Sequence, residues 1–290
     1  MTVTPVIIEL LAVVGTGLIG GSLARALRAA GAVTTIVGID ADPGNLEQAL
    51  ALGIVDEITP DVAEGVRGAQ VVFISVPVCA IAAVVRSIAP FLSPGCVVTD
   101  GGSVKAAIVN ECEKCMPPGC SFLGGHPIAG TEHSGAAASF ATLYSGKRCI
   151  LTPTDNTDAA AFEVVSRLWQ AAGANVCCME PDHHDRIFAE ISHLPHVVAY
   201  ALLHAVGTAD VEGENVLSYT AGGFRDFTRI ASSDPIMWRD IALMNREALL
   251  ASIDGFSKSL AELRQRIDRS DPRGLAEFFT IAKQFRDGFV

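Results

Sequence analysis

The sequence G-T-G-L-I-G, from Gly15 to Gly20, decides the fold expected for this chain. It follows an apolar run at Ile7–Val14, which predicts a buried strand, and it precedes a helical stretch at Ser22–Ala30. A second apolar run, Val33–Ile39, ends in Asp40, 20 residues after the third glycine. A glycine-rich turn between a strand and a helix, followed by an acid at this distance, is the fingerprint of a dinucleotide-binding βαβ unit.

The turn suits the backbone geometry that a bound dinucleotide requires. We expect Gly15 to make the tight turn, Gly17 to let the backbone approach the pyrophosphate, and Gly20 to allow close helix–strand packing. Leu18 and Ile19 complete the set of cofactor-binding positions at a helix N-terminus, which favours phosphate charge. The alternative is a glycine-rich turn in a fold that has lost its nucleotide.

The residues around Asp40 favour NAD over NADP. We expect Asp40 to accept hydrogen bonds from the adenosine ribose hydroxyls, and Asp42 follows it with no Lys or Arg beside it. A 2′-phosphate would therefore meet two acids and no cation. Ser75 and Pro77 lie where the predicted strand Val71–Val76 ends, and we count them as further candidates for cofactor contact.

Strands and helices alternate to about Glu180, and the pattern then becomes helical. Residues 1–180 are predicted to form one doubly wound sheet with helices on both faces. Residues 181–290 contain a long helical stretch at His183–Gly207, kinked at Pro195, and amphipathic helices at Ile241–Ile267 and Gly274–Phe285. We therefore expect a Rossmann-like α/β domain followed by an all-α dimerisation domain, whose apolar faces associate in a homodimer.

Composition excludes several classes of function. Of 290 residues, 50% are hydrophobic, and the net charge is −11 without a basic run, so we expect no nucleic-acid partner. The longest apolar runs are too short to span a bilayer, and no signal peptide is seen. Eight scattered cysteines suit a reducing cytoplasm. Cys112 and Cys115 form a C-x-x-C without a second pair, so no metal site is predicted.

A second glycine-rich stretch, Gly124–Gly135, reads G-G-H-P-I-A-G-T-E-H-S-G and suits a loop that approaches a ligand. His126 lies where a strand is predicted to end, which is where open parallel sheets bind ligands. The alternative is a turn whose histidine caps a neighbouring backbone group. Ser103 either caps the helix that follows it or faces the crevice. His196, one turn after His193, is either a core histidine or a ligand contact.

Five motifs occur along the chain in the order G-x-G-L-I-G-G-S-L, D-G-G-S-V-K, G-G-H-P-I-A-G-T-E, H-L-P-H and G-G-F-x-D-x-T-R-I-A-x-S-D-P-x-M-W. Together they closely resemble the prephenate/arogenate (cyclohexadienyl) dehydrogenase family of tyrosine biosynthesis, over nearly the whole chain. The resemblance implies NAD-dependent oxidative decarboxylation of prephenate to 4-hydroxyphenylpyruvate, of arogenate to tyrosine, or of both. Hydride leaves the carbinol carbon, the hydroxyl loses its proton, and carbon dioxide departs as the ring becomes aromatic.

The resemblance also implies roles for individual residues. His126 matches the histidine that accepts the hydrogen bond of the substrate hydroxyl, and Ser103 matches a serine that holds the same hydroxyl. Arg229 matches the arginine that pairs with the ring carboxylate, a use suited to its planar fork of donors. The remaining substrate-binding positions are His196 and Trp238 in the pocket, with Thr131 and Glu132 on the loop above it.

Two other functions fit parts of the sequence. A two-domain hydroxyacid dehydrogenase usually relies on a lysine in its helical domain, where Lys258 and Lys283 match no such motif. A non-catalytic NAD-binding sensor would keep the nucleotide fingerprint without needing His126 and Arg229 together. The resemblance does not decide between the prephenate and arogenate side chains. We expect neither the mutase nor the regulatory domain of some members, so feedback by tyrosine would act at the active site.

Overall fold

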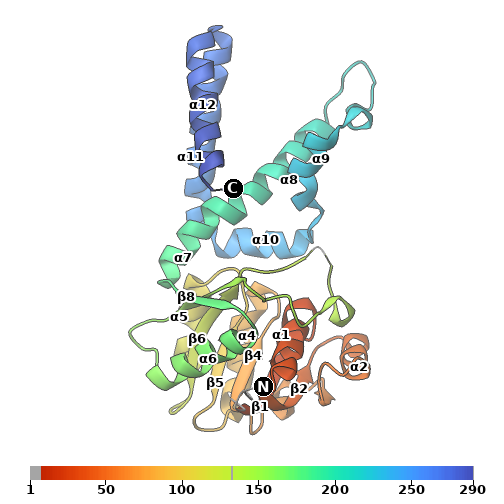
Figure 1. The fold of residues 1–290 in the computed structure, drawn as a ribbon, viewed down its shortest axis with the longest axis vertical. Coiled ribbons are helices and arrows are strands. Elements are labelled where there is room, and N and C mark those ends of the chain that lie inside the picture. The colour runs from red at the N-terminus through yellow and green to blue at the C-terminus, as the bar shows by residue number, and fades with distance from the viewer. Residues whose placement is uncertain (1–7, 132, 290) are drawn as a thin grey trace.

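A computed structural model describes residues 8–131 and 133–289 of the chain. Figure 1 shows two parts, a sheet domain and a helical part that rises from it. The predicted α/β domain followed by an all-α domain is confirmed. Ile7, where the first strand was predicted to begin, lies outside the described residues, and that strand is described from Ile8.

Eight strands form one sheet in the order β3-β2-β1-β4-β5-β6-β7-β8. Strand order reverses between β1 and β4, which is the switch point where doubly wound sheets bind ligands. The strands are β1 (Ile8–Val14), β2 (Val33–Ile39), β3 (Glu57–Thr59), β4 (Val71–Ile74), β5 (Val97–Asp100), β6 (Ser121–Pro127), β7 (Arg148–Thr152) and β8 (Asn175–Cys178).

The sheet is not parallel throughout. β7 runs antiparallel to β6, with His126 opposite Ile150, whereas β8 is parallel to β7. The segment between β6 and β7 contains no α-helix among its described residues, so the chain returns without the helical crossover that a parallel pair requires. α6 supplies that crossover between β7 and β8. The doubly wound sheet predicted from the sequence is therefore confirmed, and its last two strands run opposite to the first six.

Helices cover both faces of the sheet because the strands are apolar on both sides. Along β1, Leu11 and Val13 belong to one buried cluster and Ala12 and Val14 to the other, as the two-residue period of a strand requires. α1 and α6 pack on the first face, while α4 and α5 pack on the second. The helices of this domain are α1 (Leu18–Ala29), α2 (Pro43–Ala51), α3 (Val62–Gly65), α4 (Val78–Ile88), α5 (Ala106–Cys115) and α6 (Ala159–Ala171).

The helical part begins directly after β8. Its helices are α7 (Pro181–Phe188), α8 (Leu194–Gly207), α9 (Gly222–Thr228), α10 (Pro235–Met244), α11 (Arg246–Asp268) and α12 (Pro272–Gly288). α10 lies across the sheet domain in Figure 1, and its Ile241 is buried in the same cluster as α4 and α5. α11 and α12 form a pair that projects away from the sheet.

Two helix predictions need correction. The irregularity expected at Pro195 lies before it, in a π-helical segment at Ala189–His193, and Pro195 sits in the first turn of α8, where its missing N–H costs no hydrogen bond. The single helix predicted over Ile241–Ile267 is interrupted at Asn245, whose backbone leaves the helical region. Within the described residues, none of the helices is long and apolar enough to cross a membrane.

Candidate active site

The Gly15–Gly20 turn joins β1 to α1 at the carboxyl edge of the sheet. Gly15 has a φ of +92°, and a Cβ there would lie 2.5 Å from the Ser75 carbonyl oxygen. A Cβ on Gly20 would lie 2.0 Å from the Gly15 carbonyl oxygen, so the helix can approach the strand this closely only with glycine at that position. Ser75 holds the turn in place, because its hydroxyl donates to the Gly15 carbonyl at 2.6 Å.

The first turn of α1 fits a pyrophosphate. Its N-cap is Gly17, which has no side chain to cap the helix, and no acidic residue lies in that turn. The backbone N–H groups at Leu18 and Ile19 therefore face the sheet edge with the positive end of the helix dipole. A Cβ on Gly17 would have Gly135 N, at 3.9 Å, as its nearest neighbour among the described residues, which leaves room for a ligand. Pro77 is the exposed N-cap of α4 on the neighbouring strand end.

Asp40 follows β2 on the same edge. Its Oδ2 accepts hydrogen bonds from Thr16 N at 2.9 Å and from Asn45 Nδ2 at 2.7 Å, and its Oδ1 accepts one from Asp42 N at 3.0 Å. The carboxylate is thus held against the glycine-rich turn. Asn45 Oδ1 also accepts from Ala136 N at 2.8 Å, which ties this corner to the segment that follows His126.

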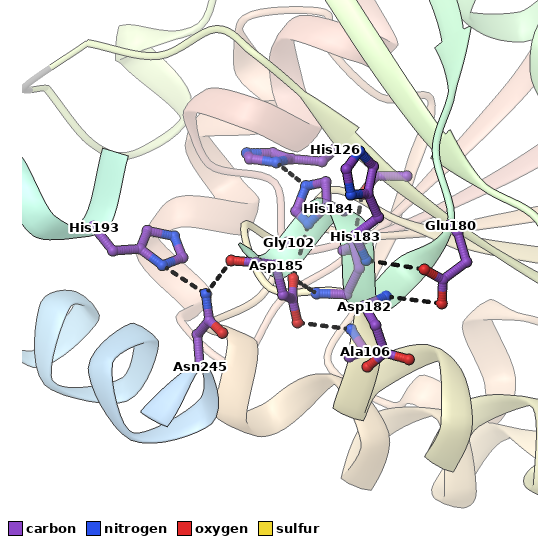
Figure 2. A network of polar contacts seen from close by, with 12 residues as sticks. Gly102, Ala106, His126, Glu180, Asp182, His183, His184, Asp185, His193 and Asn245 are labelled. Atoms are coloured by element: carbon purple, nitrogen blue, oxygen red, sulfur yellow. Dashed lines mark hydrogen bonds and ion pairs between the residues drawn. The ribbon is translucent and has the colours of Figure 1, made fainter. Parts of the chain in front are cut away.

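His126 lies near the end of β6 and contacts the first helix of the helical part. Its Nδ1 is 2.8 Å from His184 Nε2, and His184 Nδ1 is 2.8 Å from Asp185 Oδ1. Figure 2 shows these side chains in one row, ending where Asp185 meets the start of α5. His184 is fully buried and stacks on Phe188, with ring centroids 4.4 Å apart. The row leaves His126 Nε2 as the ring atom available to a ligand.

A buried ion pair lies beneath His126. Lys105 and Asp100 are both fully buried, and the Lys105 ammonium pairs with Asp100 Oδ2. Lys105 Nζ also donates to the Gly125 carbonyl at 2.9 Å, while Gly125 N donates to Asp100 Oδ1 at 3.1 Å. Both polar groups of the residue before His126 are therefore fixed by one buried pair, which sets the position of the imidazole.

The electrostatics of this region favour neutral histidines. Burial lowers the pKa of His126 well below the ordinary value for histidine, and the positive charges of His184, if protonated, and of Lys105 lower it further. Burial also lowers the pKa of His184, against the opposing effect of Asp185. Near pH 7 both rings are neutral, which is the state in which an imidazole accepts a proton.

The structure decides one alternative for Ser103. α5 begins at Ala106 and takes no cap from Ser103; instead the carboxylate of Asp185 accepts from Lys105 N at 2.8 Å and from Ala106 N at 2.9 Å. The interpretation of Ser103 as a helix cap is therefore wrong. Its side chain is half-buried on the loop after β5, and its hydroxyl forms no hydrogen bond with the described residues.

His196, Trp238 and Arg229 come together from three helical segments. The rings of His196 and Trp238 stack with centroids 3.6 Å apart. His196 Nδ1 donates to the Ser192 carbonyl at 2.9 Å, which leaves its Nε2 as an acceptor. Burial lowers the pKa of His196, and the positive charge of Arg229 contributes in the same direction. Arg229 is exposed, and its guanidinium forms no ion pair with the described part of the chain.

His193 adds a polar group to this side of the site that sequence reasoning did not assign. Asn245 Nδ2 donates to its Nδ1 at 3.0 Å and to the Asp185 carbonyl at 2.8 Å, as Figure 2 shows. Burial lowers the pKa of His193 to about 4, so its ring is neutral with the hydrogen on Nε2. That N–H and Trp238 Nε1 are both buried without a partner among the described residues.

The loop above the site is only partly described. Thr131 is exposed, and its hydroxyl accepts from His133 N at 3.2 Å. Glu132, the second loop position predicted to meet substrate, lies outside the described residues.

The two cysteines of the C-x-x-C sequence lie on α5. Cys112 is buried, and burial raises the pKa of its thiol. Cys115 Sγ donates to the Glu111 carbonyl at 3.2 Å.

Both halves of the chain match domains of known proteins. Residues 23–178 match the nucleotide-binding domain of prephenate dehydrogenase, and residues 180–281 match its dimerization domain. The chain belongs to the prephenate dehydrogenase family. Among members of the family, the cyclohexadienyl dehydrogenase of Zymomonas mobilis is 37% identical over 95% of this chain and 94% of its own. The prephenate dehydrogenase of Bacillus subtilis is 36% identical over 94% of this chain and 74% of its own.

Solved structures of the family show the same fold. Prephenate dehydrogenase from Aquifex aeolicus, in complex with hydroxyphenyl propionate and NAD+, aligns with a TM-score of 0.92 at 39% identity, over 100% of both chains. Arogenate dehydrogenase from Synechocystis aligns with a TM-score of 0.83 at 30% identity, over 97% of this chain and 100% of its own. The names of these family members refer to different substrates. Membership of the family therefore does not decide which substrate side chain this protein accepts.

Sequence reasoning missed four residues around His126. His184 and Asp185 stand in a helix of ordinary composition, and no short motif connects them to His126. Asp100 and Lys105 belong to the quoted D-G-G-S-V-K motif, yet only its serine was singled out. The sequence did contain a signal for this pair, since Lys105 follows five residues after Asp100, which ends a buried strand. Two such charges in apolar surroundings must pair.

Proposed function

We propose that this protein is an NAD-dependent dehydrogenase that oxidises and decarboxylates prephenate, arogenate or both in tyrosine biosynthesis. The observation that carries the proposal is the neutral His126 ring at the carboxyl edge of the sheet. His126 stands near the carboxyl end of β6, on the edge that also holds the dinucleotide turn, and the contact of its Nδ1 with His184 leaves Nε2 free. A proton acceptor in that position is what oxidation of a carbinol by a nicotinamide requires.

His126 Nε2 accepts the proton of the substrate hydroxyl, and Ser103 holds the same hydroxyl through its unengaged side chain. When bound, NAD supplies the hydride acceptor. The Gly15, Gly17 and Gly20 backbone with Leu18 and Ile19 would hold its pyrophosphate, and the Asp40 carboxylate would bind the ribose hydroxyls in place of one of its present donors. Ser75 serves this site by fixing the Gly15 carbonyl, and Pro77 borders it.

Arg229 pairs with the ring carboxylate, which would supply the exposed guanidinium with an anion. His196 and Trp238 form the apolar and hydrogen-bonding wall of the pocket, and Thr131 is a further substrate contact from the loop after β6. The unpartnered N–H groups of His193 and Trp238 favour a polar ligand at this place, because a buried donor without a partner costs about 1–3 kcal/mol.

The protein acts as a homodimer in the cytoplasm. Large apolar side chains on α11 and α12 are exposed, and a second copy would cover them; they include Phe256, Leu260, Ile267, Phe279, Ile281 and Phe285. We infer no nucleic-acid or membrane partner, since the net charge is −11. Tyrosine, whose side chain resembles the aromatic product, would inhibit by occupying the active site.

The deciding experiment compares steady-state turnover of prephenate and arogenate with NAD and with NADP. The proposal predicts release of carbon dioxide with formation of NADH for at least one of the two substrates. Failure to turn over either substrate, in a protein that binds NAD, would refute the activity and favour a non-catalytic sensor. The ratio of kcat/KM for the two substrates then assigns the side chain.

A further inference from the structure

The row of His126, His184 and Asp185 fixes the position of each ring hydrogen. A carboxylate only accepts, so the 2.8 Å contact with Asp185 Oδ1 places a hydrogen on His184 Nδ1. Because burial lowers the pKa of His184, its ring is neutral near pH 7, and its Nε2 is a bare acceptor. The 2.8 Å contact of that atom with His126 Nδ1 then requires the hydrogen of His126 to be on Nδ1.

With its one hydrogen on Nδ1, the neutral His126 ring presents its lone pair at Nε2. We propose that His184 and Asp185 are positioning residues that hold His126 in the tautomer whose Nε2 accepts the substrate proton. The proposal rests on the proposed function, in which His126 is the base, and adds two residues to it. Neither residue needs to touch substrate.

The His184 ring is held so that it can meet His126 in only one orientation. It is fully buried and stacks on Phe188, and the Phe188 ring lies 4.8 Å from that of His126. The centroids of the two imidazoles are 5.0 Å apart at an interplanar angle of 66°, so the rings meet edge-on with nitrogen facing nitrogen. Because the His184 ring is buried and both of its nitrogens are engaged, it cannot turn its other nitrogen toward His126 without disturbing this packing.

Asp185 is fixed by the other domain. Its Oδ1 accepts from Lys105 N and its Oδ2 from Ala106 N, so its carboxylate caps α5. Figure 2 shows the contact with Ala106. His126 belongs to the sheet domain and the two positioning residues belong to α7. The contact between the domains therefore does two things, since it completes the N-terminus of α5 and selects the tautomer of the base.

The same row stabilises the charge that develops in the reaction. When His126 Nε2 takes the proton, its Nδ1–H faces the His184 acceptor, and the His184 Nδ1–H faces the carboxylate. Asp185 polarises the row without taking the proton itself, as the aspartate does in a Ser-His-Asp triad. Without that carboxylate, His184 is free to carry its hydrogen on Nε2 and donate to His126, and His126 then loses its acceptor at the substrate.

The direct test is the tautomer of His126, measured by nitrogen-15 NMR of the full-length protein with labelled histidine and no substrate. The signal is assigned with His126→Asn. The proposal predicts hydrogen on Nδ1 and a bare Nε2 near pH 7. Hydrogen on Nε2 would overturn it, whether or not the enzyme turns over any substrate. The predicted tautomer in a protein that turns over neither prephenate nor arogenate would retain the positioning role and refute the proposed activity instead.

Variants of α7 provide the kinetic test. His184→Phe keeps a ring beside Phe188 but removes the acceptor, and kcat should fall by about 10–100-fold, as for loss of a partner that orients a functional histidine. His184→Gln, whose amide oxygen can accept from His126 Nδ1, should recover part of that loss and keep the wild-type tautomer. His183→Phe is the matched control, because His183 is the exposed neighbour on the same helix.

The affinity for NAD, measured by fluorescence, should be the same in all three variants, since the nucleotide turn lies on other elements. A His184→Phe protein with kcat within about twofold of the His183→Phe control, or with His126 still in the wild-type tautomer, would contradict the proposal. If His184→Phe does not fold, the tautomer of the wild-type protein still decides.

Discussion

Removing Lys105 tests the buried pair that fixes the end of β6 beside His126. Lys105→Met keeps a side chain of similar length but leaves the fully buried Asp100 carboxylate without its cation. Breaking a buried pair in this way costs about 3–5 kcal/mol of unfolding free energy. Asp100 retains two backbone donors, Gly102 N at 2.8 Å and Gly125 N at 3.1 Å, which favours the lower end of that range.

The Gly125 carbonyl also loses its donor, which adds about 1 kcal/mol. We therefore expect a loss of about 4 kcal/mol, which is large beside the roughly 5–15 kcal/mol that stabilises a domain. Urea unfolding followed by tryptophan fluorescence measures it, because Trp169 is fully buried in the same domain. The change should appear as a lower midpoint with an unchanged slope.

Two controls separate the buried charge from general damage. Asp100→Asn combined with Lys105→Met removes both charges, so the double variant should be more stable than Lys105→Met alone. Lys283→Met breaks an exposed pair with Asp287 and should cost less than about 1 kcal/mol. The reasoning is refuted if Lys105→Met unfolds at the urea midpoint of Lys283→Met, or if the double variant is the least stable of the three.

Four further predictions concern the catalytic roles, the pH dependence, the cofactor and the oligomeric state. His126→Asn should lower kcat by about 10²–10⁴ with a smaller change in KM, whereas Arg229→Ala should mainly raise KM, because the carboxylate it binds is already charged in the ground state. Since burial lowers the pKa of His126, kcat/KM should stay high below pH 6.5 and fall at lower pH as Nε2 is protonated, and this acid limb should be absent in His126→Asn. NAD should be preferred over NADP, and Asp40→Ser should narrow the ratio of their kcat/KM values; equal values in the wild type would contradict this. Light scattering at micromolar concentration should give the mass of a dimer, and a monomer would show that the exposed faces of α11 and α12 have another role.

The local sequence determined the elements whose geometry depends on neighbouring residues. The glycines at 15 and 20 are required by a positive φ and by a close backbone approach, both within one turn of chain, so their pattern identifies the nucleotide-binding unit directly. The change from alternating strands to continuous helix near Pro181 is likewise a local property, and α7 begins at that residue. His126 could be singled out because it stands among glycines where a strand was predicted to end, although β6 continues through it to Pro127.

Only the tertiary structure decided which distant groups meet. His184 lies 58 residues after His126, and Asp185 caps a helix that begins 79 residues before it, so no spacing rule connects them. The direction of β7 depends on the path of the chain after β6, and the break at Asn245 allows its amide to reach His193 and Asp185, which the helical periodicity of α10 and α11 does not reveal. Propensity and periodicity report what one segment does with its own neighbours. The tautomer proposed for His126 depends instead on buried polar groups from two domains that satisfy one another only after the chain has folded.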